Sequence, residues 1–141
     1  MMRLLIFHGR LSYKATEPVK ISVREDADEG EWKEFEDGLT AFCAVEASDE
    51  GRLSEITQKA ADEIQIVADR VKVKNIILYP HAHIFPRKLA KPKFAVRILK
   101  ELSTELAQRG FTVSRTPFGW YKAFKLECFG HPLSESGRTI D

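Results

Sequence analysis

The sequence has few cysteines and lacks any long apolar run. Its 141 residues include only two cysteines, Cys43 and Cys128, and these do not form a Cys-x-x-Cys pair. A disulfide framework is therefore not expected. No stretch approaches the roughly 20 apolar residues that span a bilayer, and the apolar part of the N-terminal segment is too short for a signal peptide. These absences predict a cytoplasmic protein with reduced thiols and no membrane partner.

Several common catalytic motifs are also missing. The sequence contains no Walker loop, no Gly-x-Gly-x-x-Gly fingerprint and no Gly-x-Ser-x-Gly elbow. Cys43 lies in the apolar run 42–45, which predicts an inert thiol in a core strand rather than a nucleophile acting with His83. Covalent catalysis, nucleotide hydrolysis and dinucleotide chemistry therefore have no support in the sequence.

The composition is that of a globular protein, but its charge is unevenly distributed. Hydrophobic residues make up 43% and charged residues 30%, which together with the length predicts one soluble domain over residues 1–141. Residues 1–73 hold 16 acidic and 10 basic side chains, whereas residues 74–141 hold 5 and 12. A phosphate backbone requires a basic surface, so nucleic-acid binding is one interpretation of this asymmetry. Two solvated halves without a binding role are the other.

Hydrophobic periodicity predicts both strands and helices. Short apolar or alternating segments predict strands at 3–7, 19–23, 39–47, 75–79, 111–114 and 120–128. One amphipathic helix is expected from about Ser54, as the N-cap, to Val71. A second helix should begin near Pro92 and end before Gly110, because apolar residues recur there every four positions.

Two segments lack a regular apolar pattern. Residues 25–37 contain eight acidic side chains and one lysine, and are expected to form an exposed loop or a short edge element. The tail 130–141 is expected to be irregular. The resulting order of strands, helix, strand, helix and strands predicts an α/β (α+β) fold in which two helices pack against one sheet.

Strict alternation in segment 120–128 produces one face that is apolar except for a lysine. That face comprises Trp120, Lys122, Phe124, Leu126 and Cys128. A lysine among core-facing side chains either extends its ammonium group to the edge of the sheet or takes part in chemistry. Tyr121 should point to the opposite face unless a bulge intervenes.

The histidines and one acid of the tail are the other candidate groups. His81 and His83 end a predicted buried strand, where sites are commonly built. Their two-residue spacing would suit a metal ion, but two ligands alone do not make a metal site. The other histidines, His8 and His131, do not lie at a spacing from this pair that is typical of metal ligands. A surface pair without a role is the alternative. Glu135 is by default a solvated acid.

Six segments, taken together and in order, resemble the N-terminal editing domain of archaeal threonyl-tRNA synthetases. The segments are 42–46 (Phe-Cys-Ala-Val-Glu), 79–83 (Tyr-Pro-His-Ala-His), 89–92 (Leu-Ala-Lys-Pro), 117–124 (Pro-Phe-Gly-Trp-Tyr-Lys-Ala-Phe), 130–133 (Gly-His-Pro-Leu) and 138–140 (Arg-Thr-Ile). The resemblance spans nearly the whole chain, and 117–124 is its most specific part. It implies the fold of D-aminoacyl-tRNA deacylases, with a mixed sheet and two main helices packed against it.

The resemblance also implies an activity and partners. Members of this family hydrolyse mischarged L-seryl-tRNA(Thr) and spare threonyl-tRNA(Thr), with help from the 2′-hydroxyl of the tRNA and without a metal, a cofactor or a covalent enzyme intermediate. They are typically homodimers, and the catalytic domain of the synthetase is in the same chain or on a separate one. We accordingly expect an aminoacyl-tRNA ester hydrolase whose partner is tRNA(Thr) carrying serine on its 3′ end.

The resemblance carries site residues over to this chain. The matched functional positions are Lys122, Tyr121, His83 and Glu135. The seryl group would be held mainly by main chain, and the expected binding residues are Ala44, Val45, Pro80, His81, Ala82, Phe118 and Gly119. His81 stands where the family often has an aromatic residue, and Trp120 where tyrosine is also seen. Lys122 is expected to stabilise charge on the carbonyl oxygen, while the other three position the terminal adenosine or the water.

Serine and threonine differ by one methyl group, which explains why a second site is needed. A binding pocket rejects a smaller substrate by only about 1–3 kcal/mol, whereas a tight wall can exclude an added methyl by steric clash. Three other interpretations remain open: a D-aminoacyl-tRNA deacylase, a non-catalytic tRNA-binding module of a synthetase, and a metal-dependent hydrolase using His81 and His83.

Overall fold

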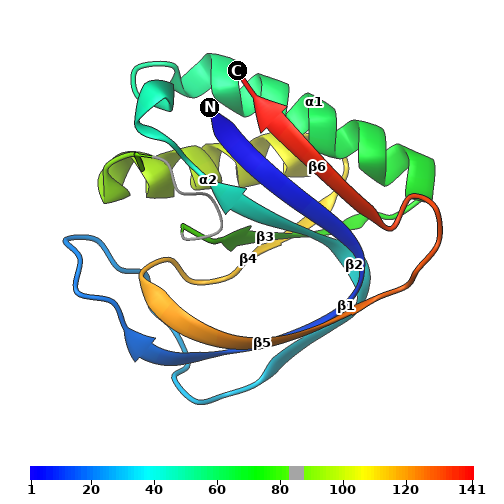
Figure 1. Ribbon diagram of the computed structural model, residues 1–141, viewed down its shortest axis with the longest axis horizontal. Helices are drawn as coiled ribbons and strands as arrows, with labels where there is room; N and C mark the ends of the chain where they lie inside the picture. Colours follow the sequence, from blue (N-terminus) through cyan, green and yellow to red (C-terminus); the bar gives the residue numbers. More distant parts are fainter. Residues whose placement is uncertain (83–87) are drawn as a thin grey trace.

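One long N-terminal strand organises the fold. This strand, β1 (Met2–Pro18), pairs antiparallel along one edge with β2 (Lys33–Ala44). Along its other edge the first half pairs with β6 (Glu135–Ile140) and the second half with β5 (Trp120–Cys128), both antiparallel. Figure 1 shows this arrangement in the computed structural model, which describes residues 1–82 and 88–141.

Parallel pairing extends the sheet beyond β2. The strands β3 (Asn75–Pro80) and β4 (Thr112–Arg115) follow in the order β4-β3-β2-β1-β5, with β6 beside β1. A short 3-10 helix, η1 (Ala47–Asp49), leads to α1 (Leu53–Val71), and α2 (Pro92–Gln108) connects β3 to β4. Both α-helices cover the same face of the sheet (Figure 1). The predicted α/β (α+β) fold with a mixed sheet and two main helices is thus confirmed.

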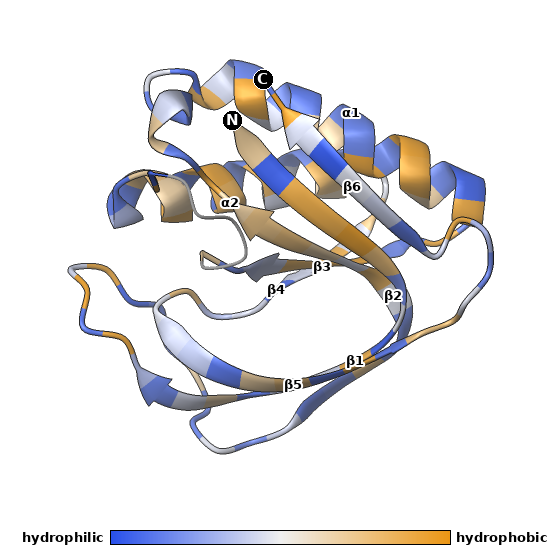
Figure 2. Cartoon of the chain, viewed as in Figure 1, coloured by the Kyte–Doolittle hydropathy of each residue, from blue (hydrophilic) through white to orange (hydrophobic). Residues whose placement is uncertain are grey.

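The main core lies between this sheet face and the helices. Met2, Leu4 and Ile6 alternate along β1 toward the helices and are essentially fully buried. The predicted apolar faces of the two helices are buried against them, as the orange bands in Figure 2 indicate, and include Ile64 in α1 and Leu102 in α2. No described helix is both long and apolar enough to cross a membrane.

The opposite face of the sheet curls over itself and forms a second apolar cluster. The buried members of this cluster are Leu11, Tyr13, Phe42, Ile77 and Tyr79. The ring centroids of Tyr79 in β3 and Phe124 in β5 are 5.6 Å apart, although β5 and β3 are not neighbours in the sheet. The curl is accompanied by a register shift in β1 after Gly9, where an added Cβ would lie 2.0 Å from the carbonyl oxygen of Glu127.

The structure corrects several of the expected elements. Residues 19–23 are irregular rather than a strand, because the Val19 amide donates to the Gly119 carbonyl oxygen and not to a sheet neighbour. The acidic segment 25–37 is a loop only in its first part, since β2 already begins at Lys33. The tail is not irregular: it forms β6, whose backbone pairs with β1 although Ile140 is its only apolar residue. The apolar pattern alone therefore misjudged residues 19–23, the start of β2 and the whole of β6.

Helix α1 begins differently from expectation. Its N-cap is Arg52 and not Ser54, and no side chain caps the first turn through a hydrogen bond. Arg52 instead pairs with Glu55, one turn along the helix. The end of α2 follows the prediction, because Gly110 directly after it has φ +96°, the left-handed conformation that glycine adopts without strain.

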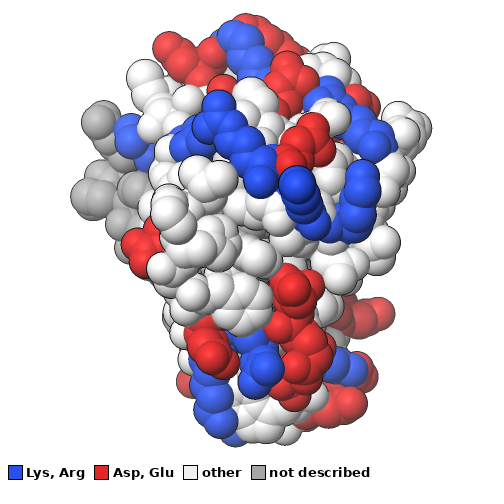
Figure 3. All heavy atoms as spheres, turned by 90° about the vertical axis from the view of Figure 1, so that its right-hand side faces the viewer, with Lys and Arg blue, Asp and Glu red and all other residues white. Residues whose placement is uncertain are grey.

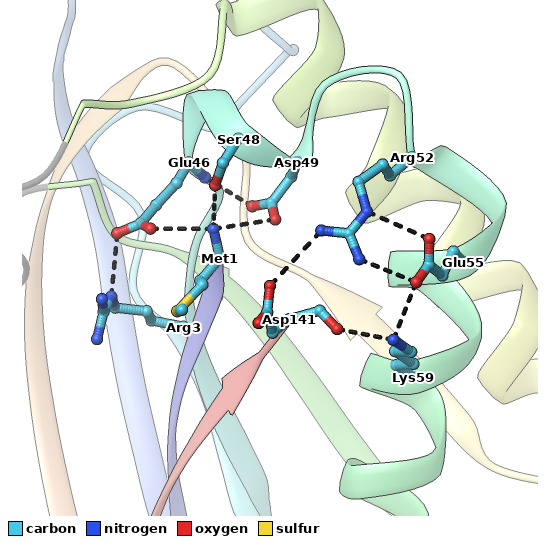
Figure 4. Close-up of polar contacts among 9 residues, drawn as sticks. All are labelled: Met1, Arg3, Glu46, Ser48, Asp49, Arg52, Glu55, Lys59 and Asp141. Atoms are coloured by element: carbon cyan, nitrogen blue, oxygen red, sulfur yellow. Dashed lines mark hydrogen bonds and ion pairs between the residues drawn. The ribbon is translucent and has the colours of Figure 1, made fainter.

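A polar cluster fastens the segment after β2 to the ends of β1 and β6. Figure 4 shows its members, which are Met1, Arg3, Glu46, Ser48, Asp49, Arg52, Glu55, Lys59 and Asp141. The Met1 amino group lies 3.1 Å from Glu46 and 3.2 Å from the fully buried Asp49. Burial would raise the pKa of Glu46, but Arg3 and this amino group outweigh burial and lower the pKa. The cluster thereby fixes the chain next to Val45.

Candidate active site

A cavity of about 380 Å³ opens where the curled sheet meets the start of α2. The parallel strands β2 and β3 end side by side there, since Cys43 is the register partner of Pro80. Such strand ends are a common location for binding sites in sheets of this kind. Every expected substrate-binding residue lines the cavity: Ala44, Val45, Pro80, His81, Ala82, Phe118 and Gly119. Lys122 and Tyr121 line it as well.

Main-chain hydrogen bonds hold the two strand ends in place. The His81 amide donates to the Cys43 carbonyl oxygen at 2.9 Å, and the Ala90 amide donates to the Val45 carbonyl oxygen at 3.0 Å. Glu46 and Leu89 form an isolated antiparallel bridge beside them. The backbone on this side of the cavity is therefore bonded to two neighbouring segments, which makes it a stiff wall.

Lys122 is the cation that the described residues place in the cavity. Its ammonium group lies 5.0 Å from the centre of the Tyr79 ring and 3.5 Å from the Trp120 carbonyl oxygen, and forms no ion pair with a carboxylate of the described residues. Burial lowers the pKa of Lys122 to about 8, and the negative charge of Glu25 opposes this shift only in part. A poorly solvated ammonium group without a close anion is suited to an incoming negative charge.

Glu25 holds the turn that forms the other wall. Its carboxylate accepts two hydrogen bonds of 2.9 Å from the Arg115 guanidinium and one of 3.1 Å from the Phe118 amide. Its carbonyl oxygen accepts a 2.8 Å hydrogen bond from the Trp120 indole. Burial would raise the pKa of Glu25, yet the Arg115 and Phe118 bonds lower it. Glu25 lies in the acidic run 25–37, where nothing in the sequence separated it from solvated acids.

Gly119 is required by both conformation and space. Its φ of +88° lies in the left-handed region, and an added Cβ would meet three atoms of Arg24 at 3.0–3.1 Å. This glycine lets the backbone turn into β5 directly beside the cavity. The placement of Lys122 three residues later depends on that turn.

Aromatic rings line part of the cavity, among them Tyr79, His81 and Phe124. Tyr79 and Phe42 are buried with ring centroids 4.8 Å apart, and Phe124 packs on both from β5. His81 packs edge-on against Phe42 at 5.7 Å, so it makes an aromatic packing contact at the position where the resembled family often has an aromatic residue. Cys43 also lines the cavity, and burial raises the pKa of its thiol to about 12. The predicted position of Cys43 in a core strand is confirmed, and its raised pKa agrees with an inert thiol.

The remaining expected functional residues are placed differently. Tyr121 is 53% exposed and lies at the rim, where its carbonyl oxygen accepts a hydrogen bond from Thr16. His83 lies outside the described residues. Glu135 is in β6, with its carboxylate 3.8 Å from the Cys128 sulfur. Cys128 is six residues along β5 from Lys122, or about 20 Å, so a single chain does not bring Glu135 to the cavity.

His8 and His131, which are far apart in the sequence, are in contact in the structure. His8 contacts His131 through ring nitrogens 2.6 Å apart, and its other ring nitrogen lies 2.7 Å from an Asp37 oxygen. The Leu133 amide donates to His131, which ties the turn before β6 to β1 and β2. Over residues 1–82 and 88–141 no three His, Cys, Asp or Glu side chains converge as metal ligands would. These histidines thus have a structural bonding role that spacing did not predict.

Comparison with solved structures defines the fold class first. The chain superposes over its full length on a c-Myc DNA unwinding element binding protein, with a TM-score of 0.62, 12% identity and 99% of that chain covered. A probable eukaryotic D-amino acid tRNA deacylase matches 97% of the chain, with a TM-score of 0.54, 9% identity and 98% of that protein covered. The fold is therefore that of the D-aminoacyl-tRNA deacylases.

The family follows from sequence comparison. Residues 2–140 match the archaea-specific editing domain of threonyl-tRNA synthetase, and the chain belongs to this family. Threonine–tRNA ligases of Methanococcoides burtonii and Methanopyrus kandleri are 45% and 44% identical to 99% of the chain. The ligase of Methanocaldococcus jannaschii is 43% identical. The chain spans 22% of the length of each of these relatives. The resemblance seen in the sequence is confirmed, and the domain is an aminoacyl-tRNA ester hydrolase.

Proposed function

We propose that the domain hydrolyses L-seryl-tRNA(Thr) and spares threonyl-tRNA(Thr), with assistance from the 2′-hydroxyl of the terminal ribose. The observation that carries this proposal is the cavity at the ends of β2 and β3, which combines main-chain walls with the partly buried ammonium group of Lys122. Carboxyl ester hydrolysis creates negative charge on the carbonyl oxygen, and a fixed cation in a dry site stabilises that charge.

The reaction needs only water and the substrate. Water attacks the carbonyl carbon of the ester, the bond from that carbon to the ribose oxygen breaks, and the ribose oxygen takes up a proton. Lys122 stabilises the oxyanion between these two steps. Tyr121, at the rim, and His83 position the terminal adenosine or the water. Because the 2′-hydroxyl assists the attack, no side chain has to act as a covalent nucleophile.

We assign the exclusion of threonine to the walls of the cavity. Val45 and Ala82 lie on stretches of backbone that neighbouring segments hold by hydrogen bonds, and Phe118 is fixed by Glu25. A wall of this kind does not yield by the 1–2 Å that an added methyl group needs. Serine fits in the same place because it lacks that methyl.

Glu135 enters the proposal through a second copy of the chain. Within one chain it does not line the cavity, and its carboxylate lies beside Cys128, which is about 20 Å along β5 from Lys122. Its expected role therefore requires the homodimer, with β6 of one copy next to the cavity of the other. The substrate partner is tRNA(Thr) carrying serine. The catalytic domain of the synthetase is proposed to be in the same chain, because the relatives that contain this domain are about four to five times as long.

Hydrolysis of seryl-, threonyl- and D-seryl-tRNA(Thr) measured side by side tests the proposed function. We expect fast release of L-serine and release of threonine at the uncatalysed rate, with no effect of a chelator. Equal release of both L-amino acids contradicts the proposal. Preferential release of D-serine indicates the D-aminoacyl-tRNA deacylase, binding without turnover indicates a tRNA-binding module, and loss of activity in chelator indicates a metal enzyme.

Deacylation should also depend on pH through Lys122. Burial lowers the pKa of this ammonium group to about 8, so the charged form is present below that pH and is lost above it. After subtraction of uncatalysed hydrolysis, kcat/KM is expected to fall about tenfold per pH unit above pH 8. The Lys122→Met variant is the control, since its residual rate should lack this dependence. A wild-type rate that is flat from pH 7 to 10 would disprove the assignment.

A further inference from the structure

Three basic side chains form a stripe along the exposed side of α2, next to the cavity. Lys93, Arg97 and Lys100 are spaced by four and three residues, which places them on one side of the helix over about 10 Å. All three are exposed, whereas the positions Pro92 and Leu99 beside them in sequence line the cavity. The stripe therefore begins where the cavity opens.

The stripe gathers three cations on one helix face beside the cavity, and their charges are not neutralised by ion pairs with the described residues. None of its three cations forms an ion pair with any carboxylate of residues 1–82 or 88–141. On α1, in contrast, Lys59 pairs with Glu55. Acidic and basic side chains are also interspersed on the face that Figure 3 shows. A row of cations without ion-pair partners retains attraction for an external anion.

The N-terminus of α2 would by itself favour acidic side chains and not the basic ones found there. A helix N-terminus carries partial positive charge and prefers acidic residues in the first turn. The first turn of α2 has no acidic residue and contains Lys93. An acidic group reaches this helix end from another segment: the Glu50 carboxylate accepts a hydrogen bond of 2.9 Å from the amide of Lys91, the N-cap residue. A local preference that the sequence contradicts is often a sign of a functional surface.

Lys100 connects the stripe to the other wall of the cavity. Its positive charge lowers the pKa of Glu25, which places its ammonium group within electrostatic reach of that carboxylate. Glu25 holds the turn of Phe118 and Trp120. The stripe thus follows the cavity rim from the start of α2 toward that turn.

We propose that this stripe binds the phosphate backbone of the RNA whose aminoacylated 3′ end enters the cavity. The proposal rests on the proposed function, because a 3′ end in the cavity has to continue across the rim, and the unpaired cations lie there. Lysine and arginine at this spacing contact successive phosphates without reading sequence. The stripe supplies affinity and register, while the cavity supplies the chemistry.

Binding of uncharged tRNA(Thr) to the triple variant Lys93→Gln, Arg97→Gln, Lys100→Gln tests the stripe. Fluorescence anisotropy should show a loss of affinity of at least tenfold at about 100 mM salt. The slope of log K against log salt should fall by about 2, since each lost phosphate contact removes about 0.7–0.9. The control triple variant Arg70→Gln, Lys72→Gln, Lys74→Gln removes the same charge from exposed positions in the last turn of α1 and directly after it, and should bind within twofold of wild type.

Deacylation kinetics separate this proposal from the proposed function. At saturating seryl-tRNA(Thr) the stripe variant should keep the wild-type single-turnover rate, with only its half-saturation concentration raised. If wild type deacylates and the stripe variant binds with unchanged affinity and salt slope, the stripe proposal is wrong and the proposed function stands. If wild type does not deacylate but the stripe variant still loses tRNA affinity, the proposed function is wrong and the stripe proposal stands. If the control variant loses as much tRNA affinity as the stripe variant, the effect is due to net charge alone and the stripe proposal is wrong.

Discussion

Replacement of Lys122 by methionine is expected to lower single-turnover deacylation of seryl-tRNA(Thr) by about 10²–10³-fold, the usual effect of removing one oxyanion-stabilising group. The ammonium group is the cation that the described part of the chain places in the cavity, and its burial strengthens its interaction with the oxyanion. The loss should exceed that of His83→Ala or Glu135→Ala, because the proposed mechanism assigns these residues to positioning and not to stabilising the reacting oxygen.

The folded state should tolerate this substitution. Burial opposes the charged form of Lys122, and methionine removes that opposition while preserving most of the volume. Thermal unfolding of Lys122→Met at pH 7 should thus occur at the wild-type temperature or above it. Lys125→Met is the matched control, since Lys125 points to the other face and lies over the Trp32 ring at 4.7 Å. Wild-type rates in Lys122→Met, His83→Ala and Glu135→Ala alike would refute the assigned roles.

Replacement of Glu25 by alanine is expected to have the second largest effect. It removes three hydrogen bonds and leaves the partly buried Arg115 guanidinium without its partner. A loss of about 2–3 kcal/mol in the free energy of unfolding follows, because both side chains are about four-fifths shielded from water. The turn at Phe118 also loses its anchor, and small displacements at a reaction centre can reduce rates up to about 100-fold.

Denaturant unfolding and single-turnover deacylation together measure the Glu25 effect. Glu127→Ala is the matched control, because Glu127 is also acidic but its side chain is 66% exposed and its contact with Arg10 spans 3.7 Å. That control should change the unfolding free energy by less than about 0.5 kcal/mol. An unfolding midpoint of Glu25→Ala equal to wild type would show that the pair contributes nothing to holding the turn.

The predictable parts of the fold are those where apolar side chains face one continuous core. Ile56 and Ile64 in α1 and Leu102 in α2 repeat with the helical period and are buried as expected. Segment 120–128 matches β5 to the residue, because its alternating face packs against the curled sheet. The lysine on that face was visible from the same alternation. Periodicity thus identified both the scaffold and the lysine to which the proposed chemistry is assigned.

The parts that escaped prediction depend on backbone pairing and on distant partners. β6 carries one apolar side chain, Ile140, so its pairing with β1 leaves almost no hydrophobic signal. Glu25 acquires its role from Arg115, which is 90 residues away in sequence. The curl of the sheet accompanies a register shift after Gly9. A single glycine in a strand can have several structural causes, so Gly9 alone did not predict the curl. Neither the wall at Phe118 nor the position of Glu135 was therefore evident from local pattern.

The central position of β1 has a consequence for how the domain is made. Of the strands of this domain, β1 is synthesised first, and it finds its partners on one edge only at the end of the domain, where Met2 pairs with Ile140 and Pro18 with Trp120. Such long sequence separations slow folding, because a large loop must close before the contact forms. Until residues 120–140 emerge, the nascent domain lacks both the closing strand and Lys122. Proofreading capacity thus appears in one late step of synthesis and not gradually.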